Sequence, residues 1–398
     1  MRKLRAAALA ALLGTSILGA GQALAQEISA AVGNPLTQAK ALAKSGNYRA
    51  AMQQADAASA AAKTATERQI VDQTKQYIAI EAGKAGDTSV GGAQGAKAKI
   101  AVDAAAGRWK EVIADGEALS KTGGLDATYS LVVAQAYYQL HDPKNCKNYI
   151  RSHGLGGETA LQTLQRCAYD DNDDATQRQA LEQLVGSTGK AEYWKDLLHL
   201  SERAKGISDH STLDIYRLKS MTGTLAGGDD VMTYALLAMQ LKMAAEAKTA
   251  VEKGMADKTL PPGDRTTRLL KQATDRANAA AASFAKDMAD AQKQPQGDAL
   301  VVLGEDQIGQ GKAKEALATI QAGIAKGCKD AANCQIRLGT AYLATGDKAN
   351  AGKTFNAVKG DEKLVMVAHL YSLYARSGAA AAPAEAPAKG KKGAKAKK

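Results

Sequence analysis

Aromatic residues and prolines are scarce in this sequence: phenylalanine, tryptophan and tyrosine make up 4% of the 398 residues, and there are seven prolines. Alanine, by contrast, is abundant throughout the chain. Alanine is the strongest helix former, whereas β-strands favour aromatic and β-branched side chains. The composition therefore predicts an all-α fold in which helices pack closely through small side chains, and it disfavours a β-sheet.

Recognisable catalytic signatures are also missing. The sequence holds neither the Gly-x-Ser-x-Gly turn of hydrolases nor the His-Glu-x-x-His helix of zinc proteases, and no carboxylate pair stands in a distinctive context. The histidines lack metal-ligand spacing; they are His141, His153, His199, His210 and His369. We therefore predict no enzymatic activity, no cofactor and no metal site, with the histidines in surface or packing roles.

Two short segments resemble ligand-binding loops without meeting their requirements. Residues 170–174 (DDNDD) lack the glycine and the final glutamate of an EF-hand calcium loop, and a loop that caps the helix from Ala175 explains them better. Residues 186–190 have the wrong glycine spacing for a phosphate-binding loop and precede Ala191 where serine or threonine is required. Neither segment indicates a ligand.

The first 25 residues have the form of a secretory signal peptide. A basic start (MRKLR) precedes an apolar run over residues 6–20, and the Ala-Leu-Ala sequence at 23–25 is a cleavage site. The run is too short for a permanent membrane anchor, and no cysteine follows it, which disfavours a lipoprotein anchor. We expect a mature chain from about Gln26, without a transmembrane anchor, in the bacterial periplasm.

Cysteine usage agrees with export, because an oxidising compartment permits disulfides. Four cysteines allow three connectivities, and we favour the two local pairs. Four buried thiols are the alternative, while the spacings fit neither a zinc ribbon nor a Cys-x-x-Cys redox motif. The expected pairs are Cys146 with Cys167 and Cys328 with Cys334.

The net charge of +11 resides mainly at the two ends of the chain. The signal segment carries three positive charges, the last sixteen residues a net five, and the body only the remaining three. Residues 378–398 are rich in Ala, Pro, Gly and Lys, a composition that cannot form a core, so we expect disorder. The tail lysines either bind an anionic surface or simply aid solubility. They are Lys389, Lys391, Lys392, Lys395, Lys397 and Lys398.

Residues 338–355 (LGTAYLATGDKANAGKTF) carry the clearest structural pattern. The Leu-Gly-x2-Tyr element from Leu338 has helical spacing, and Gly346 permits a tight turn before a second helix. Ala351 and Phe355 lie four residues apart and share one face of that second helix. The stretch therefore predicts a helical hairpin.

The Leu-Gly-x2-Tyr and Ala-x3-Phe elements resemble the tetratricopeptide repeat. Gln335 replaces the tryptophan that is common in that family, and the closing proline is absent, but neither change prevents a hairpin. The resemblance implies an α-solenoid of stacked hairpins, because one hairpin cannot bury its apolar face alone. It also implies a scaffold that holds a partner peptide or domain in a concave groove.

Weaker copies of the pattern recur over about residues 34–375, and the match is weakest over residues 175–297. The expected organisation is a signal peptide over residues 1–25, a solenoid over residues 26–377 and a basic tail over residues 378–398. The turn and packing residues expected in the copies are Gly46, Tyr48, Ala51, Gly107, Trp109, Tyr137, Gly304, Gly311, Ala316, Leu338, Gly339, Tyr342, Gly346, Ala351 and Phe355.

Several segments lie outside the clear copies. The glycine-rich residues 83–95 predict a loop, and residues 231–254 a degenerate hairpin in which Lys242 replaces the turn glycine. Residues 264–292 form either one long alanine-rich helix or a loose hairpin. Residues 362–375 predict a closing helix that caps the stack.

Taken with export, the resemblance implies a periplasmic protein-interaction scaffold with a protein or peptide partner in the cell envelope. The alternative is a tether that binds an envelope polyanion through the lysine-rich tail. The tail has no aromatic residue on which bases could stack, so no nucleic-acid partner is expected. The sequence singles out no residues that would contact the partner.

Overall fold

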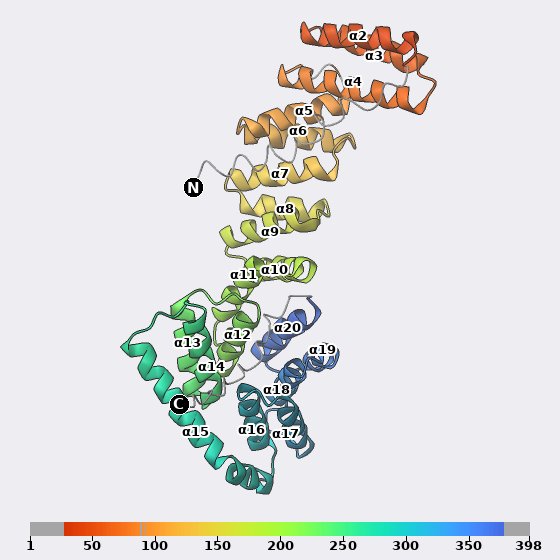
Figure 1. The fold of residues 1–398 in the computed structure, drawn as a ribbon. Helices are drawn as coiled ribbons and strands as arrows, with labels where there is room; N and C mark the ends of the chain where they lie inside the picture. Colours follow the sequence, from red (N-terminus) through yellow and green to blue (C-terminus); the bar gives the residue numbers. More distant parts are fainter. Residues whose placement is uncertain (1–27, 88–89, 91, 378–398) are drawn as a thin grey trace, which may run out of the picture. The chain divides into compact units, whose positions relative to one another are not determined.

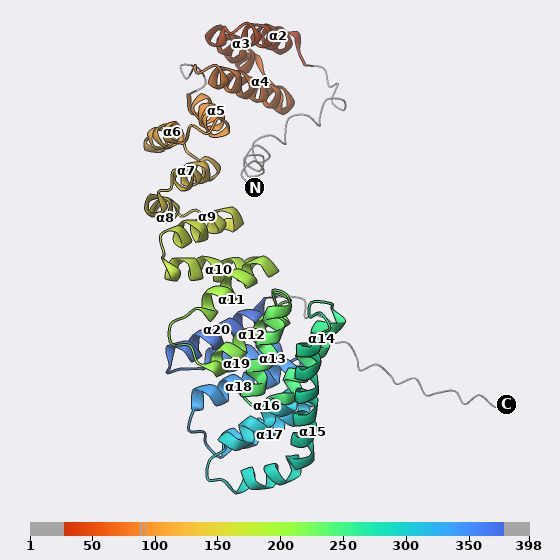
Figure 2. The same ribbon diagram turned by 90° about the vertical axis from the view of Figure 1, so that its left-hand side faces the viewer.

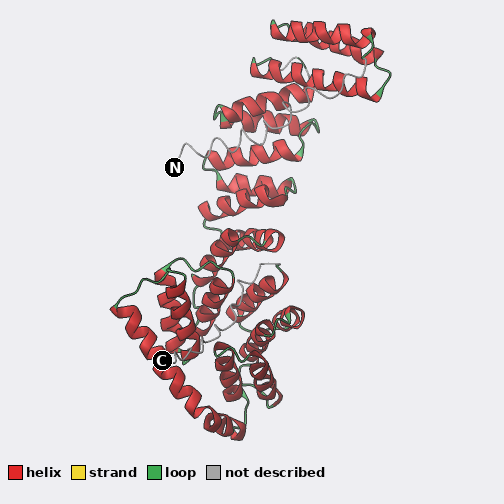
Figure 3. Ribbon diagram, in the orientation of Figure 1, coloured by secondary structure: helices red, strands yellow, loops and turns green. Residues whose placement is uncertain are grey.

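The computed structural model describes residues 28–87, 90 and 92–377; the expected signal peptide and basic tail lie outside them. All regular structure in these residues is helical, in nineteen helices with no strand (Figure 3). The all-α prediction is therefore confirmed. The described residues divide into two compact units, with the boundary between Gln177 and Arg178, within α10.

The first unit is a run of helical hairpins (Figure 1). Its helices are α2 (Ala30–Lys44), α3 (Tyr48–Ala61), α4 (Ala65–Lys84), α5 (Gly92–Ala105), α6 (Trp109–Lys121), α7 (Ala127–Gln139), α8 (Pro143–Ser152), α9 (Gly157–Asp170) and the start of α10 (Asp174–Thr188). Each helix from α2 to α8 packs on the next, and α2 also contacts α4, α5 contacts α7 and α7 contacts α9. This neighbour-only packing is the solenoid arrangement.

The second unit continues with more helices. They are the rest of α10, α11 (Ala191–Glu202), α12 (Asp209–Met221), α13 (Gly228–Gln240), α14 (Ala244–Ala256), α15 (Asp264–Lys293), α16 (Asp298–Gly309), α17 (Ala313–Ala325), α18 (Ala331–Ala344), α19 (Lys348–Asn356) and α20 (Glu362–Arg376). Residues 264–292 thus form one long helix, α15, which settles the alternative left open by the sequence.

Short turns with left-handed residues join the hairpins. Gly46 and Gly346 have φ values of 80° and 84°, a conformation that costs glycine little. Lys242 occupies the equivalent turn with φ 66°, so the degenerate hairpin keeps its turn without glycine. Asp142 and Asp347 then cap the following helices by accepting a hydrogen bond from a first-turn amide.

Close helix contacts depend on small side chains. A Cβ atom on Gly339 would lie 2.3 Å from the Phe355 ring, so α18 and α19 meet only because glycine stands there. A Cβ atom on Gly304 of α16 would similarly lie 2.4 Å from the side chain of Ile320 in α17. The glycine before Tyr342 in the repeat pattern therefore makes room for the partner helix.

The glycine-rich loop is shorter than the sequence predicts. Residues 92–95 belong to α5 rather than to a loop. Gly95 is buried, and a Cβ there would lie 2.3 Å from the carbonyl oxygen of Val90. Here glycine permits a close backbone approach at a helix start and does not end the helix.

The last helix, α20, closes the second unit on itself as well as capping α19. It packs against α18, α19 and α12, which lies about 150 residues earlier in the chain (Figure 2). The Tyr371 ring stacks on Phe355 at 5.0 Å between centroids, and Tyr374 meets Trp194 of α11 edge-on at 6.3 Å. The second unit is therefore a closed turn of helices around a central space.

Candidate ligand-binding cavity

The closed turn of the second unit surrounds a cavity of about 340 Å³. Helices α12, α13, α14, α16, α18 and α20 all contribute to its wall. Apolar lining comes from Met221, Ala250, Ile308, Leu343, Ala344 and Gly309, and neutral polar lining from Ser220, Thr249 and Thr340. The remaining lining residues are charged residues and tyrosines: Arg217, Tyr234, Glu246, Lys253, Glu305 and Tyr371.

A buried ion cluster lies beside this cavity, with Arg337 at its centre. The guanidinium donates hydrogen bonds to both carboxylate oxygens of Asp214, at 2.8 Å from Nη1 to Oδ1, and to Glu305 Oε1 at 2.7 Å. Asp214 and Arg337 are 0% and 1% exposed. The Tyr371 hydroxyl donates to Asp214 Oδ1 at 3.2 Å. These bonds join α12, α16, α18 and α20.

Arg217 extends the cluster to the cavity wall. Its guanidinium makes a bidentate pair with Glu246, at 2.7 and 2.6 Å, and also donates to Glu305 at 2.7 Å and to Asp214 at 3.0 Å. The Tyr234 hydroxyl donates to Glu246 Oε1 at 2.7 Å. α13 and α14 thereby join the same network.

The cluster is held in its ionised form. Burial alone would raise the pKa of Asp214, but the guanidiniums of Arg337 and Arg217 outweigh it and hold that pKa below its usual value. The same opposition of burial and the two arginines lowers the pKa of Glu305. For Tyr371, burial and the Asp214 charge both raise the pKa, so the hydroxyl stays a hydrogen-bond donor.

The chemistry of the cavity wall follows from how its polar groups are paired. The guanidiniums of Arg217 and Arg337 are hydrogen-bonded to carboxylates of the cluster, and these bonds support the wall of the cavity. The residues lining the cavity include neither histidine nor cysteine, and the hydroxyls of Thr249 and Thr340 donate to the backbone carbonyls of Ala245 and Arg337. What the cavity offers a ligand is apolar surface, neutral hydroxyls and the exposed Lys253.

The residues expected from the sequence to shape the repeats do not line the cavity. The buried ones are Ala51, Gly304, Ala316, Gly339, Ala351 and Phe355; Tyr48, Trp109, Tyr137, Leu338 and Tyr342 are half-buried; Gly46, Gly107, Gly311 and Gly346 lie in exposed turns. The buried and half-buried residues pack between helices, and the four exposed glycines form turns between helices. The nearby Thr340, Leu343 and Ala344, on the other face of α18, line the cavity instead.

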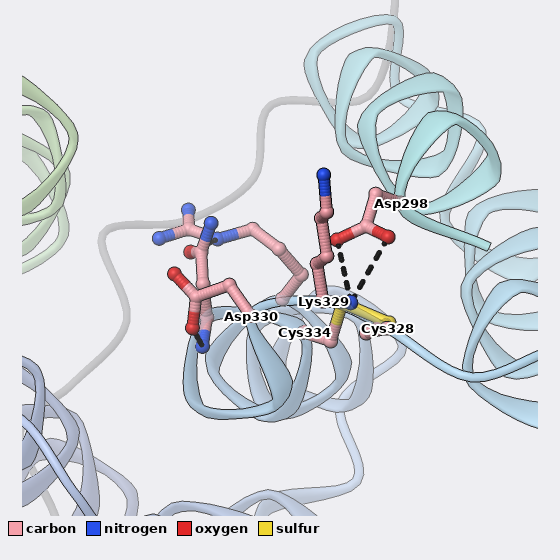
Figure 4. The surroundings of a disulfide bond; sticks show 7 residues. Asp298, Cys328, Lys329, Asp330 and Cys334 are labelled. Carbon is pink, nitrogen blue, oxygen red and sulfur yellow. Dashed lines mark hydrogen bonds between the residues drawn. A yellow bond between two sulfur atoms is a disulfide. The ribbon is translucent and has the colours of Figure 1, made fainter. Parts of the chain in front are cut away.

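Both expected cysteine pairs are disulfide-bonded. Cys146 of α8 and Cys167 of α9 are completely buried, with 6.3 Å between their Cα atoms. Cys328 follows α17 and bonds Cys334 in α18, with 6.6 Å between Cα atoms (Figure 4). The first bridge links two consecutive helices, and the second links the loop after α17 to the start of α18.

The acidic segment 170–174 has the capping role predicted for it. Asp173 accepts a hydrogen bond from the Thr176 amide at the start of α10. The Lys147 ammonium pairs with Asp171 at 2.7 Å and with Asp173 at 2.6 Å. The tail lysines and the residues of the expected signal peptide lie outside the described residues.

The ion cluster was not foreseen from the sequence, although it left a signal there. Asp214 stands between Leu213 and Ile215, and Arg337 between Ile336 and Leu338. A charged residue inside an apolar helical stretch is rarely fully buried unless it is paired. The apolar neighbours therefore indicate that each charge has a partner. Only the structure shows that Asp214 of α12 and Arg337 of α18 are each other's partners.

No family model matches the chain, and no curated protein matches it. Among solved structures, it is similar to a tetratricopeptide repeat protein from Parabacteroides merdae ATCC 43184, at 12% identity over 66% of this chain and 98% of that one. The TM-score is 0.26, so the fold assignment rests on the helices of this chain themselves. None of the described helices is long and apolar enough to cross a membrane.

Proposed function

We propose that this protein is a non-enzymatic interaction scaffold that holds a peptide segment of a partner protein in the cavity of its second unit. The observation that carries the proposal is the cavity itself, preformed by six helices and kept rigid by the ion cluster. A preformed site avoids the entropic cost of ordering its own wall on binding.

The lining favours a peptide over a charged small metabolite. Specific sites for small anions or cations present unpaired groups of opposite charge, whereas the charges of this wall largely neutralise one another. An apolar side chain can pack on Ile308 and Leu343, while the hydroxyls of Thr249 and Thr340 bind the polar backbone beside it. About 340 Å³ accommodates two or three side chains rather than a folded domain.

The proposed place of action is the bacterial periplasm, and the partner is an envelope protein. The support is the signal-peptide form of residues 1–25, together with two disulfides that an oxidising compartment preserves. The lysine tail supplies a further anionic-surface contact in this proposal, and removal of the residues after Ser377 separates the two activities. Partner capture that survives this truncation indicates the helical unit.

Affinity capture from envelope extract tests the cavity with a matched pair of substitutions. Ala344→Trp adds a bulky side chain at the exposed rim of the cavity on α18, and Ala349→Trp adds the same side chain at an exposed position of α19 outside the cavity. The partner is expected to be retained by the wild type and Ala349→Trp and lost with Ala344→Trp, while all three give the same circular dichroism. Equal capture by both variants would contradict the cavity as the binding site.

A further inference from the structure

A carboxylate from a distant part of the chain lies beside the Cys328–Cys334 disulfide. A carboxylate oxygen of Asp298, at the start of α16, and the two sulfur atoms all lie within 4.8 Å of one another (Figure 4). Asp298 is 30 residues away from Cys328 along the chain. For that reason the cysteine spacing alone, which fits no zinc ribbon, predicts no metal site.

The carboxylate is positioned independently of the sulfur–sulfur bond. The Lys329 amide donates to both oxygens of Asp298, at 3.2 and 3.1 Å, and the Gly297 amide donates to the Gly327 carbonyl at 2.8 Å. Gly297 also lies so close to Gly323 that a Cβ atom would sit 1.7 Å from its carbonyl oxygen. The loop before α18 thus stays against α16 when the disulfide opens.

The two disulfides differ in their access to a reductant. Both sulfurs of the Cys146–Cys167 pair belong to fully buried residues, whereas Cys328 is half-buried in a surface loop. Cys334 lies in the first turns of α18, where the helix N-terminus stabilises a thiolate. Attack on the accessible sulfur of Cys328 therefore expels a good leaving group.

We propose that Cys328, Cys334 and Asp298 form a redox-gated site for one soft divalent metal ion such as Zn²⁺. A thiolate of a protein dithiol reductant attacks Cys328 Sγ, which forms a mixed disulfide and releases the Cys334 thiolate. The second thiolate of the reductant then attacks the reductant's first sulfur, which is bonded to Cys328. This closes the reductant's own disulfide and releases the Cys328 thiolate. Two electrons pass to the protein cysteines, and the reductant leaves as a disulfide.

The ligand set matches zinc chemistry. Zn²⁺ binds thiolates at about 2.3 Å and carboxylates at about 2.0–2.2 Å, so two tetrahedral sulfur ligands lie about 3.8 Å apart. Opening the disulfide to that separation needs only a small movement of the loop at Cys328. Two thiolates and the carboxylate supply three ligands and water the fourth, and Lys326 and Lys329 in the same loop moderate the negative charge. The metal then keeps α16, α17 and α18 joined in the reduced protein.

Titration of the full mature chain with Co²⁺, as a spectroscopic probe for Zn²⁺, tests the site. After mild treatment with a phosphine reductant, alkylation and mass mapping are expected to find Cys328 and Cys334 reduced, with Cys146 and Cys167 still bonded. Reduced protein is expected to bind one Co²⁺ with sulfur-to-metal charge-transfer absorption that Zn²⁺ displaces. Untreated protein is expected to show none.

Two matched variants separate this site from adventitious binding. Asp298→Asn is expected to weaken Co²⁺ binding by about tenfold or more. Asp330→Asn changes a neighbouring acid that only caps α18, and it is expected to bind like the wild type. Three results would overturn the proposal: no Co²⁺ binding to the reduced chain, the same spectrum from Cys328→Ser/Cys334→Ser, or equal affinity in Asp298→Asn and the wild type.

Discussion

Arg337 of α18 and Asp214 of α12 form a fully buried ion pair across 123 residues of sequence. The pair joins the beginning of the second unit to its end, and Tyr371 of α20 donates to the same carboxylate. Solenoids normally rely on contacts between neighbouring elements only. This long-range link acts together with the packing of α20 on α12 to close the helices of the second unit around the cavity.

Removing one partner of the pair is expected to destabilise the second unit strongly. Arg337→Met leaves Asp214 buried without its main counter-charge, which costs about 3–5 kcal/mol of unfolding free energy. In a Trp109→Phe background the buried Trp194 reports unfolding of this unit in urea. Lys271→Ala, in an exposed pair with Asp275, serves as the control and is expected to change stability by less than about 1 kcal/mol.

The double variant Asp214→Leu/Arg337→Met refines this test. Because it removes both charges together, it is expected to be more stable than Arg337→Met alone. A double variant as unstable as the sum of its two single variants would show that the pair acts through something other than charge compensation.

Glycine substitutions separate close packing from helix propensity. Gly339→Ala places a Cβ 2.3 Å from the Phe355 ring, and overpacking of this kind costs about 1–3 kcal/mol. Gly186→Ala in α10 meets nothing within 4 Å and is expected to stabilise the unit by about 0.5–1 kcal/mol. Both values follow from the same Trp194 urea titration. A stabilising Gly339→Ala would refute the tight α18–α19 contact.

Acid is expected to loosen the start of the first unit through Glu67. Hydrogen bonds from the Ser29 hydroxyl and from the amides of Thr64 and Lys63 lower its pKa from 4.5 to about 2. Because the folded-state pKa is depressed, this stabilisation is fully present above about pH 4.5 and is lost as the pH falls through about 2.

Hydrogen exchange over residues 29–84 measures this effect. Wild type is expected to be better protected than Glu67→Gln at pH 7, and the difference is expected to shrink steadily between pH 4.5 and 2. A difference that is constant over this range would show that the Glu67 charge does not stabilise the start of α4.

The sequence predicts those parts of the fold that depend on near neighbours. The hairpin around Gly346, the closing helix α20 and the capping role of Asp173 all follow from residues a few positions apart. Local cysteine pairing belongs to the same class, because short loops favour closure. Helical periodicity and turn chemistry carry such information directly.

The cavity could not be predicted in the same way. Its wall combines six helices between residues 209 and 376, and its ion cluster depends on which helices meet across the closed turn. The apolar neighbours of Arg337 indicate a paired charge, but the sequence does not identify Asp214 as its partner. Asp298 is similar, since its relation to Cys328 depends on how α16 packs beside the following loop.

Photo-crosslinking in intact cells tests the central claim most directly. A benzophenone amino acid replaces Ala344 in one strain, at the exposed rim of the cavity, and Ala349 in another, exposed on α19 outside the cavity. The account predicts an envelope-protein crosslink from position 344 and none from position 349. A crosslink to the same partner from position 349 alone, or equally from both, would contradict the cavity as the site of partner binding.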